Sequence, residues 1–415
     1  MTSSWVPVPE GSDFPLANLP YGVFSTRQDR ATRLGVAIGD FVVDLRALAG
    51  AVAVPHPELF SAATLDPMLA AGRPAWTEVR ARLAEVLGGQ APPLPGDVLC
   101  RRDAVTLHLP FRTGDFVDFY SSLEHATNVG RLWRGDGEPL SENWRRIPVA
   151  YHGRAGSVAI SGTAVRRPCG QWMEPGATTP TFGPTERLDF ELELGFVTGG
   201  TVPAGEALSM ARAPEHLFGV MLVNDWSARD IQAFEYRPLG PFLGKSFATT
   251  VSPWVVTFDA LAPYRVPSPA QDPVPPPHLR AEGAWALDIE LAVELRTAGA
   301  PDAATLSRTN AAALYWTMPQ QLVHAASNGA SVRPGDLFAT GTISGAHRGA
   351  YGSLLELSDN GRNPMVLPDG DRRTFLADGD TVTLRGWCEE PGDPARPRIG
   401  FGECVGRIEP AHLQG

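Results

Sequence analysis

The sequence predicts a mainly β protein of the α+β class, built from a small N-terminal unit and a large C-terminal one. Glycine and proline are abundant (43 and 39 of 415 residues), and such frequent chain breakers argue against an all-helical bundle. A single hydrophobic core usually stops growing near ~250–300 residues, so a chain of this length has room for two units. We place the boundary near residue 110, which gives units of residues 1–110 and 111–415.

The N-terminal unit is expected to contain a hairpin and a helix. Two apolar segments, 34–38 and 41–45, flank Gly39-Asp40, a dipeptide typical of a tight β-hairpin turn. A helix is predicted where apolar side chains recur every three or four residues and Gly88-Gly89 follows. The apolar positions of this helix are Trp76, Val79, Leu83, Val86 and Leu87. The proline-rich segment 91–96 is interpreted as a linker.

From about Phe111 onward the chain consists of short apolar runs separated by glycine and proline, which is typical of strands in a large β domain. The clearest runs are 158–160, 188–197, 217–223 and 381–384. The proline-rich segment 266–277 is expected to be an ordered surface excursion.

Charge and composition exclude several classes of protein. The net charge of −11 argues against a nucleic-acid partner, which requires clustered basic residues. It leaves room for an anionic small molecule bound by a few local arginines. Four cysteines without a C-x-x-C pair indicate reduced thiols of a cytoplasmic protein. No signal peptide and no apolar run of ~18 residues is present, so no membrane association is expected.

The segment Leu188–Leu194 carries three acidic residues at alternate positions. In a strand, this alternation would put Asp189, Glu191 and Glu193 on one face and apolar side chains on the other. Carboxylates two residues apart lie about 7 Å apart and repel, so such a face is either solvated or binds a cation.

An uninterrupted apolar run, 217–223, is typical of a strand buried on both faces, and it ends in Asn224-Asp225. Asp225 could cap the helix expected over 226–232. Alternatively, it could supply an oxygen ligand to the cation bound by the Glu pair. Mg²⁺ and Ca²⁺ prefer such carboxylate ligands.

A third segment, 115–125, brings acidic residues, Tyr120 and His125 close together, and Arg131 and Arg134 follow. Histidine is the usual general base near neutral pH. A structural role for His125 is the alternative.

The chain contains 34 arginines and a single lysine, Lys245, which follows Gly240 and Gly244 in an otherwise uncharged stretch. A compact ammonium beside a cation site would stabilise developing negative charge, although the lysine could also be there by chance. The Gly/Thr/Ser turn at 341–345 offers backbone and hydroxyl donors for a carboxylate.

Several long motifs, taken together, resemble the fumarylacetoacetate hydrolase family across essentially the whole chain. They occupy residues 118–130, 151–154, 191–193, 224–232, 238–247 and 341–345. The resemblance implies a homodimer of chains in which a small SH3-like β-barrel precedes a large β-sandwich-roll catalytic domain. It also implies hydrolysis of 4-fumarylacetoacetate to fumarate and acetoacetate, the last step of tyrosine and phenylalanine catabolism.

The resemblance further assigns roles to individual residues. It implies a Mg²⁺ and/or Ca²⁺ site at Asp118, Glu191, Glu193, Asp225, Lys245 and Thr249. It implies a general base, its orienting carboxylate and an oxyanion-stabilising set at His125, Glu356, Arg229, Gln232 and Lys245. It implies substrate contacts at Tyr120, Arg134, Tyr151, Gln232, Tyr236 and Thr342.

Two alternatives stay open from the sequence. One is a related hydrolase of the same superfamily that acts on acylpyruvates or other diketo acids, which the N-terminal unit disfavours. The other is a metal-binding structural or ligand-sensing protein, which the presence of His125, Glu356 and Lys245 disfavours because binding alone needs no general base.

Overall fold

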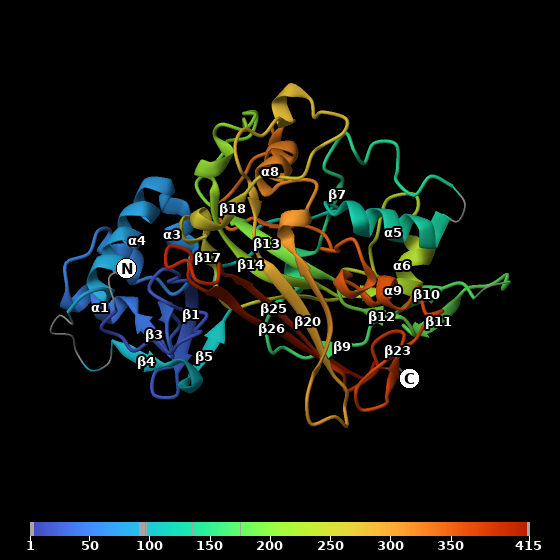
Figure 1. Cartoon of the computed structure of the whole chain (residues 1–415), viewed down its shortest axis with the longest axis horizontal. Helices are drawn as coiled ribbons and strands as arrows, with labels where there is room; N and C mark the ends of the chain where they lie inside the picture. Colours follow the sequence, from blue (N-terminus) through green and yellow to red (C-terminus); the bar gives the residue numbers. More distant parts are fainter. Residues whose placement is uncertain (1–3, 91–95, 97, 135–136, 175, 413–415) are drawn as a thin grey trace.

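The computed structural model describes residues 4–90, 96, 98–134, 137–174 and 176–412. The N-terminal unit lies at one side of a larger, mostly β unit (Figure 1). The predicted mainly β fold with two units is confirmed. Most of the expected linker, residues 91–95, lies outside the described residues. Among the described residues, no helix combines the length and apolar character needed to cross a membrane.

The N-terminal unit is a five-stranded antiparallel sheet with helices packed beside it. In spatial order β4-β3-β2-β1-β5, the strands are Leu99–Arg101, Phe41–Asp44, Arg33–Ile38, Tyr21–Thr26 and Val105–His108. The predicted hairpin is β2–β3, and Gly39 in its turn has φ +53°, where a Cβ atom would lie 2.3 Å from the Pro7 carbonyl oxygen. The predicted helix is α4 (Arg73–Leu87), which follows α1 (Leu45–Ala51), α2 (Pro57–Phe60) and α3 (Asp66–Ala71).

A mixed eight-stranded sheet forms the centre of the large unit. Along its main path, β7-β6-β22-β13-β14-β16-β8, the strands are Ala150–His152, Phe116–Phe119, Leu337–Ala339, Leu192–Thr198, Leu217–Asp225, Thr249–Val251 and Val158–Ile160. The remaining strand, β17 (Val256–Thr257), pairs with β14. The β22–β6 and β16–β8 pairs are parallel. This order places the ends of β6, β13 and β14 near one another although they are distant in sequence.

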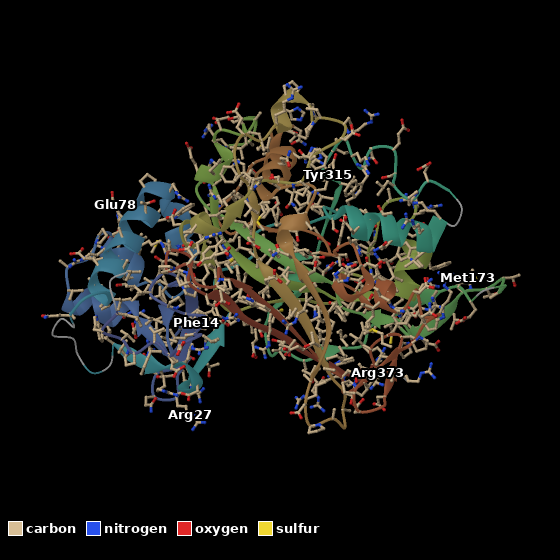
Figure 2. The ribbon with its side chains drawn as sticks, in the orientation of Figure 1. Phe14, Arg27, Glu78, Met173, Tyr315 and Arg373 are labelled. Carbon is tan, nitrogen blue, oxygen red and sulfur yellow. The ribbon has the colours of Figure 1, made fainter. Side chains whose placement is uncertain are left out.

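Strand β14 is buried on both faces, as its apolar run predicts. Leu222 packs into the core that the central sheet shares with the second sheet of this unit, whereas Phe218 and Met221 pack against the N-terminal unit. The second sheet has the order β21-β20-β25-β26-β9, with strands Ala304–Asn310, Glu290–Arg296, Thr381–Cys388, Ile399–Glu409 and Val165–Arg166. The two units also meet at Phe14, which Figure 2 labels. Its ring centroid lies 5.9 Å from that of Trp254.

The prediction of a single acidic strand over residues 188–194 is wrong. The chain instead forms β12 (Leu188–Asp189), which pairs with β15 (Ser227–Ala228), and then β13, which starts at Leu192 and pairs with β14. Between them, Glu191 makes an isolated bridge to Ser353. The solvated face is also wrong, because Asp189, Glu191 and Glu193 are only 0%, 5% and 0% exposed.

Two helices carry side chains to the site, α5 (Leu123–Arg134) and α6 (Arg229–Glu235). The capping role considered for Asp225 is wrong. Helix α6 begins three residues later than expected, with Ala228 at its N-cap, because the short strand β15 intervenes. Asp225 is the last residue of β14.

Candidate active site

A cavity of about 320 Å³ opens between α5, α6 and the ends of the central strands. The predicted site residues that line this cavity are Asp118, Tyr120, His125, Arg134, Tyr151, Glu191, Arg229, Gln232, Tyr236, Lys245 and Thr342. Glu193, Asp225 and Glu356 lie behind this lining, in contact with residues that form it, and Thr249 contacts Asp225. The structure therefore brings the predicted site residues together in one place.

Four buried carboxylates form a cluster at the floor of the cavity. Each contributes an oxygen, and these oxygens all lie within 4.8 Å of one another. The members are Asp118, Glu191, Glu193 and Asp225. They converge because β6 and β13 are both neighbours of β22, and β14 is the other neighbour of β13.

Three hydroxyl and ammonium groups hold Asp225 in this cluster. Tyr151 Oη donates a hydrogen bond to Asp225 Oδ2 at 2.8 Å, and Thr249 Oγ1 donates to Oδ1 at 2.9 Å. Lys245 Nζ donates to Asp225 Oδ2 at 2.8 Å and also to Glu191. An ammonium has donors but no lone pair, so Lys245 cannot itself bind a metal. It instead contacts carboxylates that could.

The carboxylates of the cluster have pKa values shifted in opposite directions. Burial would raise the pKa of Glu191, but Lys245 and Arg229 outweigh burial and hold that pKa below its ordinary range. Burial and neighbouring carboxylates instead raise the pKa values of Asp118 and Glu193 well above the ordinary range. Without another cation, these two groups would hold protons at pH values where a free carboxyl is ionised.

The donor set fits a divalent cation. Among the described residues, Asp118 Oδ1 and Glu193 Oε1 are buried and have no hydrogen-bond partner. Such buried oxygens normally have a partner, and a hard cation such as Mg²⁺ or Ca²⁺ binds oxygen ligands of this kind. The four-carboxylate cluster is therefore a candidate site for a divalent metal.

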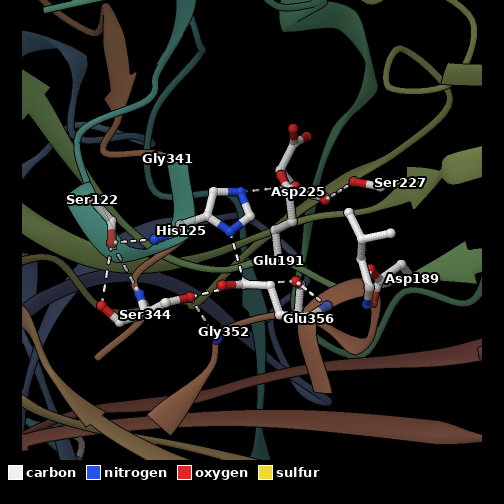
Figure 3. Close-up of polar contacts among 12 residues, drawn as sticks. Ser122, His125, Asp189, Glu191, Asp225, Ser227, Gly341, Ser344, Gly352 and Glu356 are labelled. Atoms are coloured by element: carbon white, nitrogen blue, oxygen red, sulfur yellow. Dashed lines mark hydrogen bonds and ion pairs between the residues drawn. The ribbon is translucent and has the colours of Figure 1, made fainter. Parts of the chain in front are cut away.

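His125 lies beside the cluster and is oriented from behind by Glu356 (Figure 3). Its Nδ1 lies 2.7 Å from Glu356 Oε2, and its Nε2 lies 4.0 Å from Glu191 Oε1. Burial would raise the pKa of Glu356, but His125 and other hydrogen-bond donors lower it. An ionised Glu356 accepts a hydrogen bond from Nδ1–H, which leaves Nε2 as the acceptor on the cluster side.

Arg229 is held on several sides and lines the cavity. Its Nε donates to Asp189 at 2.8 Å, and its Nη1 donates to Glu191 at 2.7 Å and to Gln232 at 3.1 Å. Nη2 is buried and has no partner among the described residues. It is therefore the guanidinium nitrogen that remains available to a further acceptor.

Aromatic and polar side chains form much of the remaining cavity lining. The ring of Tyr120 lies edge-on to His125, with centroids 5.4 Å apart. Arg134 is exposed at the end of α5 and donates to the Pro139 carbonyl. Thr342 Oγ1 is buried and has no hydrogen-bond partner within the described part of the chain.

The donor turn expected at 341–345 binds carboxylates of the protein itself. The Gly341 amide donates to Glu193 Oε2 at 3.1 Å, and Ser344 Oγ donates to Glu356 Oε2 at 2.9 Å. Gly341 has φ +79°, and a Cβ atom there would lie 2.1 Å from the Phe119 carbonyl oxygen. Glycine is therefore required for this approach.

Sequence reasoning missed two groups of site residues. Trp133 lines the cavity and packs against Tyr236, with ring centroids 5.3 Å apart. The helical spacing of His125, Val129 and Trp133 could have found it, because positions four apart share one face of α5. Asn128 and Ser353, which donate to Glu356 at 2.9 and 2.8 Å, carry no comparable signal.

Comparison with known protein families supports this description. The family described as "Fumarylacetoacetate (FAA) hydrolase C-terminal" matches residues 116–409, and "Fumarylacetoacetase N-terminal" matches residues 17–110. The chain belongs to the fumarylacetoacetate hydrolase family. A fumarylacetoacetase of Rattus norvegicus is 48% identical over 98% of this chain and 99% of the relative. A fumarylacetoacetase of Caenorhabditis elegans is 49% identical over 99% and 100%, and that of Arabidopsis thaliana is 45% identical over 99% of each.

Solved structures share the fold at lower identity. A fumarylacetoacetate hydrolase from Exiguobacterium antarcticum has a TM-score of 0.52 and 18% identity, covering 95% of this chain and all of that one. A maleylpyruvate hydrolase from Sphingobium has a TM-score of 0.50 and 16% identity over 95% of this chain and 100% of that one. These likenesses show that the chain shares its fold with these enzymes.

Proposed function

We propose that this chain hydrolyses a carbon–carbon bond of 4-fumarylacetoacetate to give fumarate and acetoacetate, at the end of tyrosine and phenylalanine catabolism. The observation that carries the proposal is the placement of the His125–Glu356 pair beside the four-carboxylate cluster in one cavity. Full-length relatives named fumarylacetoacetase support this substrate over other diketo acids.

In the proposed reaction, His125 is the general base. Glu356 fixes the imidazole so that Nε2 can take a proton from the attacking water, which then adds to the carbonyl carbon that becomes the new carboxyl group of fumarate. A divalent cation held by Asp118, Glu191, Glu193 and Asp225 would act as a Lewis acid toward the diketo oxygens. When the bond breaks, the electron pair stays on the acetoacetate carbon and is delocalised as an enolate. This carbon then takes up the proton that His125 removed from the water, which completes acetoacetate and regenerates the base.

The remaining cationic and polar groups would stabilise the negative charge that develops in the reaction and would contact the substrate. Arg229, Gln232 and Lys245 would stabilise the oxyanion, and one such donor can be worth about 3–4 kcal/mol. The Nη2 atom of Arg229 supports this role because it is buried and lacks a partner among the described residues. The substrate contacts proposed at the wall and mouth of the cavity are Tyr120, Arg134, Tyr151, Gln232, Tyr236 and Thr342.

The proposed cation is Mg²⁺, Ca²⁺ or both. All four candidate ligands are carboxylates, which favour hard cations over zinc or copper. Toward the cation, Lys245 and Thr249 would act through the carboxylate of Asp225, to which both donate hydrogen bonds.

A homodimer and a cytoplasmic location also belong to the proposal. Four large apolar side chains on and after α6 are exposed, Phe234, Leu239, Phe242 and Leu243. A cluster of this kind supports an interface with a second copy of the chain, and Leu239 also lines the cavity. The cytoplasmic location stays a prediction from the cysteine content.

A spectrophotometric assay tests the proposed activity. The purified protein should consume fumarylacetoacetate with equal yields of fumarate and acetoacetate, and much faster than it consumes an acylpyruvate. Treatment with EDTA should abolish turnover, and Mg²⁺ or Ca²⁺ should restore it. A protein that prefers the acylpyruvate, or that is indifferent to EDTA and metal, would contradict the proposal.

A further inference from the structure

Asp189 is a buried carboxylate that none of the roles above uses. It ends β12, is 0% exposed, and stands outside both the four-carboxylate cluster and the described lining of the cavity. A carboxylate withdrawn from water in this way requires strong hydrogen bonds. Its partners therefore indicate what it does.

Asp189 joins two parts of the site that are far apart in the sequence. Its Oδ2 accepts hydrogen bonds from Arg229 Nε at 2.8 Å and from the Leu355 amide at 2.9 Å. Its Oδ1 accepts from the amides of Leu354 at 2.7 Å and Phe190 at 2.8 Å. One carboxylate thus binds both a cavity-lining guanidinium and the first turn of α9 (Leu354–Leu357).

On one side, Asp189 fixes the plane of the Arg229 guanidinium. Nε is held by Asp189, and Nη1 is held by Glu191 and Gln232. Because the guanidinium is planar, these contacts also fix the direction of Nη2, which is buried without a partner among the described residues.

On the other side, Asp189 anchors the helix turn that carries Glu356. The two amides it binds belong to the residues immediately before Glu356, whose carboxylate meets His125 at 2.7 Å. Figure 3 shows Asp189 and His125 on opposite sides of Glu356. A shift of this turn would move Glu356 away from the imidazole.

We propose that Asp189 is a positioning residue that aligns Arg229 and Glu356 with each other, so that oxyanion stabilisation and proton transfer occur in the same geometry. This inference rests on the proposed function and deepens it. Asparagine cannot replace the carboxylate, because each oxygen of Asp189 accepts two N–H groups. Whichever way an amide is turned, its NH₂ group would face two donors.

The test compares Asp189→Asn with a matched buried aspartate elsewhere. Asp380 is also 0% exposed; it binds Arg373 Nε and Nη2 at 2.9 and 3.0 Å and the Ala377 amide at 2.9 Å. Misplacement of catalytic groups by about 1 Å can lower a rate about 10²-fold. We expect Asp189→Asn to lower kcat by about that factor with KM within threefold, and Asp380→Asn to keep kcat within twofold.

A double variant separates positioning from general destabilisation. If Asp189 acts through Arg229, the loss of kcat in Asp189→Asn/Arg229→Lys should be at least tenfold smaller than the product of the two single losses, because the groups are coupled. Wild-type turnover measured in parallel distinguishes failure of this inference from failure of the proposed function. Kinetics are normalised to the folded fraction, determined from thermal melting.

Several outcomes would overturn the inference. One is an unchanged kcat per folded Asp189→Asn molecule, and another is a double variant whose losses simply multiply. If Asp189→Asn does not fold, Asp189→Glu, which retains the charge, replaces it with the same expected loss of kcat. If neither folds while Asp380→Asn does, the carboxylate serves folding, and the positioning role is rejected.

Discussion

Replacing Glu356 by glutamine should remove the charge behind His125 while keeping most hydrogen bonds. Glu356 Oε2 accepts from His125 Nδ1, Ser344 Oγ and Ser353 Oγ at 2.7, 2.9 and 2.8 Å. Its Oε1 accepts from Asn128 Nδ2 at 2.9 Å. A glutamine oxygen in the Oε2 position keeps the first three bonds, and Asn128 can turn its own amide to accept from the new NH₂ group.

The expected loss follows from the charge alone. When His125 takes a proton, its imidazolium lies against the Glu356 carboxylate. Two unit charges about 4 Å apart attract by about 4 kcal/mol at an effective dielectric constant of about 20. This energy corresponds to roughly 10³-fold in rate. Because the proton is only partly transferred in the transition state, we expect kcat to fall by about 10²–10³-fold, with KM nearly unchanged because Glu356 lies behind the cavity lining.

Steady-state kinetics with thermal melting measure this effect. Glu294→Gln is the matched control, because Glu294 pairs with Arg385 at 3.0 Å in the second sheet; it should keep kcat within twofold. If folded Glu356→Gln kept kcat within about fivefold of wild type, the charge would contribute less than about 1 kcal/mol. The general-base role of His125 would then be refuted.

Three further predictions concern the base, the lysine and the cluster. His125→Ala should lower kcat by about 10²–10⁴-fold with substrate binding largely intact, and near-normal kcat would require another base. Lys245→Arg should lower kcat about 10²-fold, because a planar guanidinium cannot place one compact charge against two carboxylates. A Lys245→Arg variant that retains more than half of wild-type kcat/KM would contradict this prediction. The control is Arg333→Lys, because Arg333 forms an exposed ion pair with Asp115. Because the pKa values of Asp118 and Glu193 are raised, Mg²⁺ binding should release protons and tighten by about tenfold per pH unit for each proton displaced. The melting temperature of the metal-free protein should correspondingly fall as pH rises above the ordinary carboxyl pKa, since the folded state then binds more protons than the unfolded chain. Calorimetry that finds no proton release on Mg²⁺ binding would contradict the raised pKa values.

Local patterns predicted much of the fold. The β2–β3 hairpin follows from its Gly39-Asp40 turn, and α4 follows from its apolar spacing. The apolar run of β14 predicts burial on both faces, which the structure explains through the N-terminal unit on one side and the second sheet on the other. In each case, neighbours in the sequence suffice to specify the element.

The acidic segment shows where local patterns fail. Alternation alone predicts three equivalent carboxylates on one strand. The strand is instead interrupted between β12 and β13, because Asp189 and Glu193 pair with different strands. Long-range contacts decide this, including the bridge from Glu191 to Ser353 and the bonds from Asp189 to α9. The roles of His125 and Glu356 likewise depend on a contact between residues 231 positions apart, so only the family resemblance could pair them.

The most direct test of the central claim is a crystal structure of the protein with Mn²⁺ as an anomalous probe of the divalent site. We predict one anomalous peak bound by oxygens of Asp118, Glu191, Glu193 and Asp225, at distances of about 2.0–2.6 Å. His125 Nε2 should face the same cavity without binding the ion. A peak located elsewhere, or no peak at saturating Mn²⁺, would contradict the assignment of this cluster as the metal centre.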